Sequence, residues 1–334
     1  MFNIGIIGYG YWGPNLVRNF SANKECTVKF VSDVRKERLE LVKKNYPLVI
    51  TEENYLTITE DRSIDIVVIA TPVGTHFAIA KKALQNGKHI WVEKPFTANS
   101  KQAEELIELA EKNNLKIFVD HTFLYTGAVM KIKDIINSGE LGDILYFDSV
   151  RVNLGLFQRD VNVIWDLATH DISIMYNLID KKVTAVAAHG IANYYDYENI
   201  ANISVYFENN CYAHFHVNWT SPVKIRKVIV GGDKKMLVFD DLENFEKIKI
   251  YDAGVSIKNS NEIYSALADY RLGDMFSPKV NQTEALALGV SEFISSISEV
   301  REPNTNGWNG LQVVKILEAA DHSIKNKGIL VEVI

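Results

Sequence analysis

The feature that most constrains the fold is a glycine-rich loop near the N-terminus. Three glycines, Gly8, Gly10 and Gly13, are spaced as Gly-x-Gly-x-x-Gly and come after the apolar run Ile4–Ile7. Pro14 follows at once, where a first helical turn tolerates its missing N–H. Such glycines allow a tight turn, a close approach of phosphates and close helix–strand packing. The loop therefore predicts a strand–turn–helix unit that binds a dinucleotide pyrophosphate, although a glycine-rich turn without a ligand is the simpler alternative.

An acidic residue stands where such a unit holds the adenosine ribose. Asp33 ends the apolar run Thr27–Ser32, about 20 positions after Gly13. A carboxylate there accepts hydrogen bonds from the ribose and repels a 2′-phosphate, which favours NAD. Arg35 and Lys36 follow closely and offer cations to such a phosphate, so NADP stays open as the alternative.

Short apolar runs and amphipathic segments alternate over the first ~120 residues. Alternation with short links predicts parallel βαβ units, and hence an α/β Rossmann domain with a doubly wound parallel sheet over residues 1–122. Expected strands are Ile4–Ile7, Thr27–Ser32, Ile64–Ala70, His89–Val92 and Lys116–Val119, and expected helices are Trp12–Ser21, Lys36–Asn45, Phe77–Asn86 and Lys101–Asn113.

The pattern changes in the second half, where strand-like runs follow one another without helices between them. We expect residues 123–334 to form an α+β domain for substrate binding and oligomerisation, with a mostly antiparallel open sheet. We leave open that the last helix or the strand-like run Ile329–Val333 belongs to the first domain. Expected strands are Asp143–Val152, Val183–Ala188, Ile200–Glu208, Cys211–Trp219, Ile225–Val230 and Met236–Asp240, and expected helices are Ala128–Ser138, Trp165–Ile179, 282–300 and 309–327.

Charge and hydropathy exclude several classes of partner. The formal net charge is −6 and no basic tail is present, which argues against a nucleic-acid partner. No apolar run approaches the ~20 residues that span a bilayer, and a strand begins at Phe2 without a signal-like segment. We therefore expect no membrane partner and a cytoplasmic location.

A lysine follows the expected strand His89–Val92, in the sequence Glu93-Lys94-Pro95. This position lies at the carboxyl edge of the sheet, where open α/β sheets bind their ligands. Pro95 fixes the turn and keeps the backbone of Lys94 extended. Taken alone, a solvated loop lysine is the simpler interpretation. With the glycine loop nearby, a functional Lys94 is favoured.

These motifs, with the Ile69-Ala70-Thr71-Pro72 turn and His76, resemble the Gfo/Idh/MocA family, the glucose–fructose oxidoreductases and inositol dehydrogenases. The resemblance covers most of the chain. It implies an NAD(P)-dependent oxidoreductase that acts on CH–OH groups, in which Lys94 contacts both substrate and nicotinamide. The cofactor-binding residues implied are Gly8, Gly10, Tyr11, Trp12, Gly13, Asp33, Arg35, Thr71, Pro72, His76, Glu93 and Lys94.

The family also places an aspartate and a histidine four residues apart on a helix of its second domain. Asp166 and His170 have this spacing, which puts them on one helix face. The resemblance implies that His170 is the general base, because imidazole takes a hydroxyl proton near neutral pH. Asp166 would bind a substrate hydroxyl or orient the base, and Lys94 would polarise the substrate oxygen. An ordinary surface pair is the alternative for Asp166 and His170.

Further substrate-binding candidates lie in segments expected to border the site. They are His121, Tyr125, Asn153 and Arg159. A structural histidine is the alternative for His121, and a solvated loop is the alternative for Asn153 and Arg159.

Two other features have simpler interpretations. His214 and His216 share a strand face, but no third ligand is spaced to complete a site, so we expect no metal. Trp219 is expected to build the sheet, with substrate contact as the alternative.

The segment Gly8–Phe20 resembles family members that act on nucleotide sugars for surface polysaccharides. This implies oxidation at C3 of a UDP-N-acetylhexosamine or its uronate. Alternatives are a free polyol or sugar dehydrogenase of the inositol type, an NAD-binding sensor without turnover, and an NAD-dependent glycosidase. The family resemblance also implies a homodimer or homotetramer assembled through the C-terminal sheet.

Overall fold

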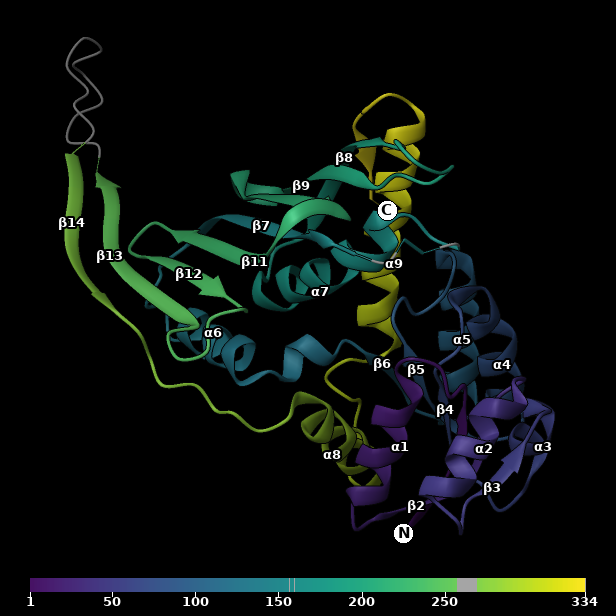
Figure 1. The fold of residues 1–334 in the computed structure, drawn as a ribbon. Helices are drawn as coiled ribbons and strands as arrows, with labels where there is room; N and C mark the ends of the chain where they lie inside the picture. The colour runs from purple at the N-terminus through teal and green to yellow at the C-terminus, as the bar shows by residue number, and fades with distance from the viewer. Residues whose placement is uncertain (156, 159, 257–268, 334) are drawn as a thin grey trace. The chain divides into compact units, whose positions relative to one another are not determined.

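The computed structural model describes residues 1–155, 157–158, 160–256 and 269–333 (Figure 1). The chain divides into two compact units. Met1–Tyr125 and Thr283–Lys315 form the first, and Thr126–Gln282 and Ile316–Ile334 form the second. The sequence placed the boundary at 122/123 and left open that the last helix or strand returns to the first domain. The chain therefore returns to its first unit after the second has begun.

The first unit contains a parallel sheet of six strands in the order β3-β2-β1-β4-β5-β6, which confirms the expected Rossmann architecture. The strand order reverses between β1 and β4, and the loops that follow such a switch point form the ligand crevice. The strands are β1 (Phe2–Ile7), β2 (Cys26–Ser32), β3 (Ile50–Glu52), β4 (Ile66–Ile69), β5 (His89–Glu93) and β6 (Ile117–Asp120).

Helices cover this sheet, and α4 and α5 lie side by side (Figure 1). The helices of the first unit are α1 (Gly13–Ala22), α2 (Lys36–Asn45), α3 (Tyr55–Glu60), α4 (Val73–Gln85), α5 (Ser100–Lys112), the 3₁₀ turn η1 (Thr122–Tyr125), α8 (Ala285–Ser298) and the first part of α9 (Gly307–Lys325).

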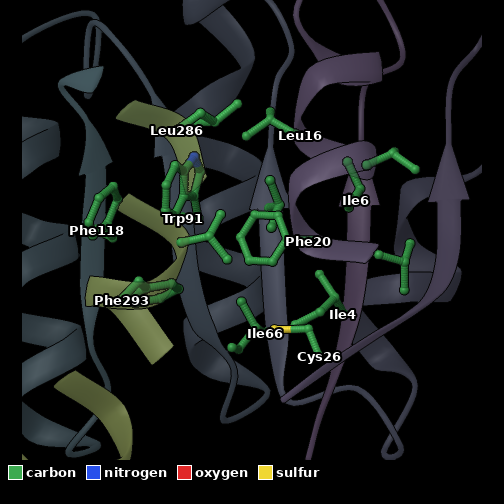
Figure 2. Packing of buried hydrophobic residues seen from close by; sticks show 14 of the residues in the cluster. Ile4, Ile6, Leu16, Phe20, Cys26, Ile66, Trp91, Phe118, Leu286 and Phe293 are labelled. Carbon is green, nitrogen blue, oxygen red and sulfur yellow. The ribbon is translucent and has the colours of Figure 1, made fainter. Parts of the chain in front are cut away.

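An aromatic cluster explains why α8 returns to the first unit. Trp91 on β5 is fully buried and stacks on Phe118 of β6 with ring centroids 3.9 Å apart. Phe20 of α1 and Phe293 of α8 meet the same indole edge-on (Figure 2). Gly289 allows the close approach, since a Cβ there would stand 3.2 Å from the Trp91 ring. Without α8 these rings would face water.

The second unit contains a nine-stranded sheet in the order β14-β13-β12-β11-β7-β10-β9-β8-β15. Only the β10–β7 pair is parallel among the pairs of the described strands, which confirms the mostly antiparallel sheet. The strands are β7 (Ile144–Leu154), β8 (Val183–Ile191), β9 (Ile200–Phe207), β10 (Tyr212–Asn218), β11 (Thr220–Gly232), β12 (Met236–Asp240), β13 (Ile248–Ser256), β14 (Asp269–Phe276) and β15 (Val331–Glu332).

At one end of the strands of this sheet, several chain segments lie close together. Ile191 of β8 pairs with Ile200 of β9, Ile200 with Asn218 of β10, and Asn218 with Val152 of β7. The carboxyl ends of β7 and β10 and the β8–β9 connection therefore lie together. The helices of this unit are α6 (Gly127–Asn137), the π-helical turn η2 (Ile164–Ala168), α7 (Thr169–Leu178) and the remainder of α9, with the 3₁₀ turn η3 at Glu208–Asn210.

The two faces of the second sheet differ in burial. Along β10, Ala213, Phe215 and Val217 are buried, while the alternating His214 and His216 stay partly exposed. One face therefore forms core, and the other is open within this chain. Among the described residues no helix has the length and hydropathy of a membrane span.

Candidate active site

The glycine loop joins β1 to α1 at the switch point of the first sheet. Gly8 has φ +100°, and a Cβ on it would lie 2.3 Å from the Ala70 carbonyl oxygen. A Cβ on Gly13 would lie 2.4 Å from the Gly8 oxygen. A Cβ on Gly10 would meet nothing closer than Arg35 at 3.6 Å. Gly8 and Gly13 thus shape the loop, while the open side of Gly10 suits the approach of a pyrophosphate.

Asp33 lies directly after β2, and only 6% of it is exposed. Its carboxylate accepts hydrogen bonds from the Tyr9 and Arg35 backbone N–H groups at 2.8 and 3.0 Å, and from the Arg35 guanidinium at 2.9 Å. Burial alone would raise the pKa of Asp33, but the bonds from Arg35 and Tyr9 outweigh it and lower that pKa. The ionised carboxylate suits ribose hydroxyls, and the half-exposed Arg35 beside it suits a 2′-phosphate.

His76 ties together two loops at the same edge of the sheet. Its ring is 1% exposed, with Nε2 2.7 Å from the Thr71 carbonyl oxygen and Nδ1 3.0 Å from the Pro95 carbonyl oxygen. The turn after β4 is further held by the Thr71 and Thr75 hydroxyls, 2.7 Å apart. His76 therefore positions the turn at Thr71-Pro72 relative to the turn that carries Lys94.

Two carboxyl groups meet at the ends of β5 and β6. Glu93 and Asp120 are register partners. Thr122 Oγ1 donates to Asp120 at 2.6 Å, and the Trp12 indole N–H of the glycine loop donates to it at 3.3 Å. Burial, and for Glu93 also the nearby Asp120, raises the pKa of both carboxyl groups. The pair therefore retains a proton more readily than exposed carboxyl groups would, and Trp12 couples the glycine loop to it.

Lys94 follows Glu93 and acts electrostatically on this cluster. His121 is 1% exposed, and burial together with the charge of Lys94 lowers its pKa to about 3. The same charge counteracts the rise in the pKa of Glu93. Neither ring nitrogen of His121 has a hydrogen-bond partner among the described residues. His121 is thus a neutral imidazole near the Lys94 ammonium, in the region where the sequence predicts substrate.

In the second unit, Asp166 and His170 lie on consecutive helical turns. Asp166 belongs to η2, and His170 is the second residue of α7, so both fall within the expected helix Trp165–Ile179. The Trp219 indole N–H, one residue after β10, donates to Asp166 Oδ2 at 2.9 Å. Trp219 is 1% exposed and therefore holds the carboxylate in a fixed orientation.

A polar network holds the start of η2. Asn162 Oδ1 accepts hydrogen bonds from the Ile164 and Trp165 N–H groups at 3.1 and 3.2 Å. Its amide nitrogen donates to Asp321 of α9 at 2.9 Å and to Glu198 at 3.1 Å. The Trp165 indole donates to Asp321 at 2.8 Å. The turn that carries Asp166 is thereby fixed at its first residues.

A buried ion pair lies beneath α7. Arg151 of β7 donates two hydrogen bonds to Asp171, at 2.8 and 2.7 Å, and Ser149 donates a third at 2.8 Å. The side chains of Arg151 and Asp171 are 5% and 3% exposed. Asp171 directly follows His170, so this pair fixes the helix segment that presents the imidazole.

The remaining residues predicted to bind substrate or cofactor differ in how far they are exposed. Tyr125 is buried, stacks near Phe118 and shares a hydrogen bond of 3.1 Å with Thr305, a packing arrangement. Asn153 is partly exposed near the end of β7, and Tyr11 is 92% exposed. Arg159 lies outside the described residues. The substrate contacts assigned to these residues stay predictions.

No group of three or more His, Cys, Asp or Glu side chains within the described part of the chain is arranged to hold a metal ion. His216 instead has Nδ1 3.0 Å from Asn202 Oδ1 across the sheet.

Sequence reasoning missed the residues that position the predicted site. For Trp219 the sequence favoured packing over substrate contact, although a buried indole N–H needs an acceptor and so signals a polar partner. Arg151 and Asp321 carried no local signal, because their partners lie 20 to 159 positions away in the sequence.

Two family models match the chain. The model described as an oxidoreductase family with an NAD-binding Rossmann fold matches residues 2–121. The model of the GFO/IDH/MocA C-terminal domain matches residues 129–238. Together they cover more than half of the chain.

Several curated proteins are similar in sequence. The uncharacterised oxidoreductase YdgJ of Escherichia coli is 36% identical over 149 residues, 44% of this chain and 42% of that protein. The scyllo-inositol 2-dehydrogenase (NADP(+)) IolW of Bacillus subtilis is 26% identical, covering 97% of this chain and 94% of its own. The UDP-N-acetylglucosamine 3-dehydrogenase of Acidithiobacillus ferrooxidans is 25% identical, with coverages of 75% and 76%.

Solved structures share the fold. The Acidithiobacillus ferrooxidans UDP-N-acetylglucosamine 3-dehydrogenase GnnA superposes with a TM-score of 0.82 at 22% identity, over 97% of this chain and 98% of that chain. Levoglucosan dehydrogenase in complex with NADH and L-sorbose superposes with a TM-score of 0.84 at 18% identity, over 100% and 99%.

Proposed function

The chain belongs to the Gfo/Idh/MocA family of NAD-binding oxidoreductases, and from that premise we propose that it oxidises a hydroxyl of a nucleotide sugar. The preferred substrate is a UDP-N-acetylhexosamine or its uronate, oxidised at C3. Similarity to a UDP-N-acetylglucosamine 3-dehydrogenase supports this substrate class. The observation that carries the proposal is the fixed Asp166 carboxylate four residues before His170, because binding and deprotonating a hydroxyl requires such groups.

The glycine loop and Asp33 fit a dinucleotide. Gly10 leaves room beside the backbone, and we assign the ionised Asp33 to the adenosine ribose, from whose hydroxyls such a carboxylate would accept hydrogen bonds. When bound, NAD supplies the acceptor for the hydride that leaves the substrate carbon. Arg35 beside Asp33 keeps NADP as the second candidate cofactor.

We assign His170, Asp166 and Lys94 to one substrate hydroxyl. His170 takes the O–H proton while the C–H bond gives up its hydride, so the carbon becomes a ketone and the protein gains one proton. Asp166 accepts a hydrogen bond from the substrate, and Trp219 keeps its carboxylate aligned. The Lys94 ammonium stabilises negative charge that develops on the substrate oxygen.

A second candidate is oxidation of a free polyol, since the inositol dehydrogenase IolW aligns over 97% of this chain. NADH formation at 340 nm separates the candidates. Turnover of UDP-N-acetylglucosamine or its uronate supports the nucleotide-sugar proposal, and preference for scyllo-inositol or glucose overturns it. Tight NAD binding without turnover of any sugar would identify a sensor, and sugar release without net NADH would identify a glycosidase.

We also propose that the open face of the second sheet pairs with another copy of the chain. An open antiparallel face with half-buried side chains such as His214 and His216 suits such pairing. Light scattering of the full chain checks this, and a monomeric mass contradicts it.

A further inference from the structure

Three aromatic rings form a cluster at the end of the second sheet where β7 and β10 terminate. Phe157 lies after β7, and Tyr194 and Tyr195 lie in the β8–β9 connection. The Phe157 ring centroid is 5.8 Å from that of Tyr194 and 5.6 Å from that of Tyr195, both edge-to-face. The tyrosines are 67% and 71% exposed. They therefore offer π faces that the described chain leaves accessible.

The connection that carries the tyrosines is anchored at its base. Asn199 is fully buried, and its side chain accepts a hydrogen bond from the Asn193 N–H at 2.7 Å and donates one to the Asn193 side chain at 3.4 Å. The Glu198 carbonyl accepts from the Val163 N–H at 2.9 Å, directly before η2. The rings are thus attached to the segment that positions Asp166, which favours a functional role over a solvated loop.

Trp219 connects the ring cluster to the proposed catalytic group. Its ring centroid is 5.4 Å from that of Phe157, and its indole N–H donates to Asp166. Phe157 lies between the two tyrosines and Trp219. The tyrosines are therefore further from Asp166 than Trp219 is. A substrate whose reacting carbon lies at Asp166 reaches them only through a part beyond the reacting sugar ring.

We propose that Tyr194 and Tyr195, supported by Phe157, stack on the nucleobase of a nucleotide-sugar substrate. This inference rests on the proposed function and adds the residues that bind the base. Bases stack on aromatic side chains regardless of their hydrogen-bond pattern. The segment 193–198 carries Asp196 and Glu198 and no lysine or arginine, so it suits the uncharged base and disfavours the diphosphate.

Leucine and phenylalanine substitutions at both tyrosines test the aromatic requirement. In Tyr194→Leu/Tyr195→Leu, bulk is kept and the π faces are lost, so we expect KM for the nucleotide sugar to rise about tenfold or more while kcat changes less than twofold. Tyr194→Phe/Tyr195→Phe should behave like the wild type. Phe245→Ala, which removes an 87% exposed ring elsewhere, is the control for surface aromatics. Equal KM values in the leucine variant and the wild type overturn the proposal.

Uridine binding separates failure of this site from failure of the proposed function. In saturation-transfer NMR with the NAD-loaded full chain, uridine signals should appear with the wild type and phenylalanine variant and vanish with the leucine variant. That result supports the site even if no nucleotide sugar is turned over. Nucleotide-sugar turnover with unchanged uridine signals in the leucine variant overturns the site and leaves the proposed function standing. Signals from methyl glucoside but none from uridine overturn the nucleobase assignment.

Discussion

The two units bury their ionisable groups in opposite ways. At the carboxyl edge of the first sheet, Glu93 and Asp120 share a buried position, and their pKa values rise because burial disfavours two charges. Beneath α7 of the second unit, the side chains of Arg151 and Asp171 are 5% and 3% exposed, and they neutralise each other as an ion pair. The first arrangement responds to pH, whereas the second provides a rigid support.

The largest effect is expected at the ion pair. Arg151→Met leaves Asp171 buried without its cation, so the free energy of unfolding should fall by about 3–5 kcal/mol. Chemical denaturation measures this. Arg226→Met is the matched control, because its pair with Asp241 is more exposed, with side chains at 34% and 18%, and should cost less than about 1 kcal/mol. Equal losses in the two variants would show that burial of the Arg151 pair has no special role.

A smaller effect is expected at Trp219. Trp219→Phe removes the indole N–H that holds Asp166 and keeps most of the ring, and a hydrogen bond to a charged group is worth about 1.5–3 kcal/mol. We expect kcat/KM to fall about tenfold or more with most of the fold stability retained. Steady-state kinetics beside a thermal melt check this. Trp308→Phe, which alters a half-exposed indole bonded to Glu111, should leave kcat/KM unchanged.

The acid pair should show a pH-dependent effect. Because the folded pKa values of Glu93 and Asp120 lie above their unfolded values near 4, the folded state binds extra protons above that pH and loses stability as the pH rises. Asp120→Asn removes one carboxyl group and with it the nearby charge that raises the pKa of Glu93. Its free energy of unfolding relative to the wild type should therefore rise with pH above about 4, by up to about 1.4 kcal/mol per pH unit for each proton.

Urea titrations between pH 4 and 8 measure this difference. Glu37→Gln, an exposed acid on α2, should give a difference that stays flat with pH. A flat difference for Asp120→Asn as well would mean that the pair is ionised in the folded protein.

Local patterns predicted the first unit well. Strand–helix alternation identified its sheet, because that pattern concerns neighbouring backbone, and the spacing of Gly8, Gly10 and Gly13 predicted the tight turn between β1 and α1. Contacts between distant segments were not predictable. The donation from Trp219 to Asp166 spans 53 positions, and the return of α8 to Trp91 depends on packing that no local pattern encodes. The hydrogen bond between Tyr125 and Thr305 spans 180 positions and is equally absent from any local pattern.

We propose above that Lys94 and His170 act on one substrate hydroxyl. Single-turnover NADH formation in Lys94→Met, His170→Asn and the double variant tests it most directly, since groups that act as a unit lose their effects together. We expect each single variant to slow the reaction by about 10²–10⁴-fold and the double variant to be hardly slower than the worse single one. Losses that multiply in the double variant would contradict it.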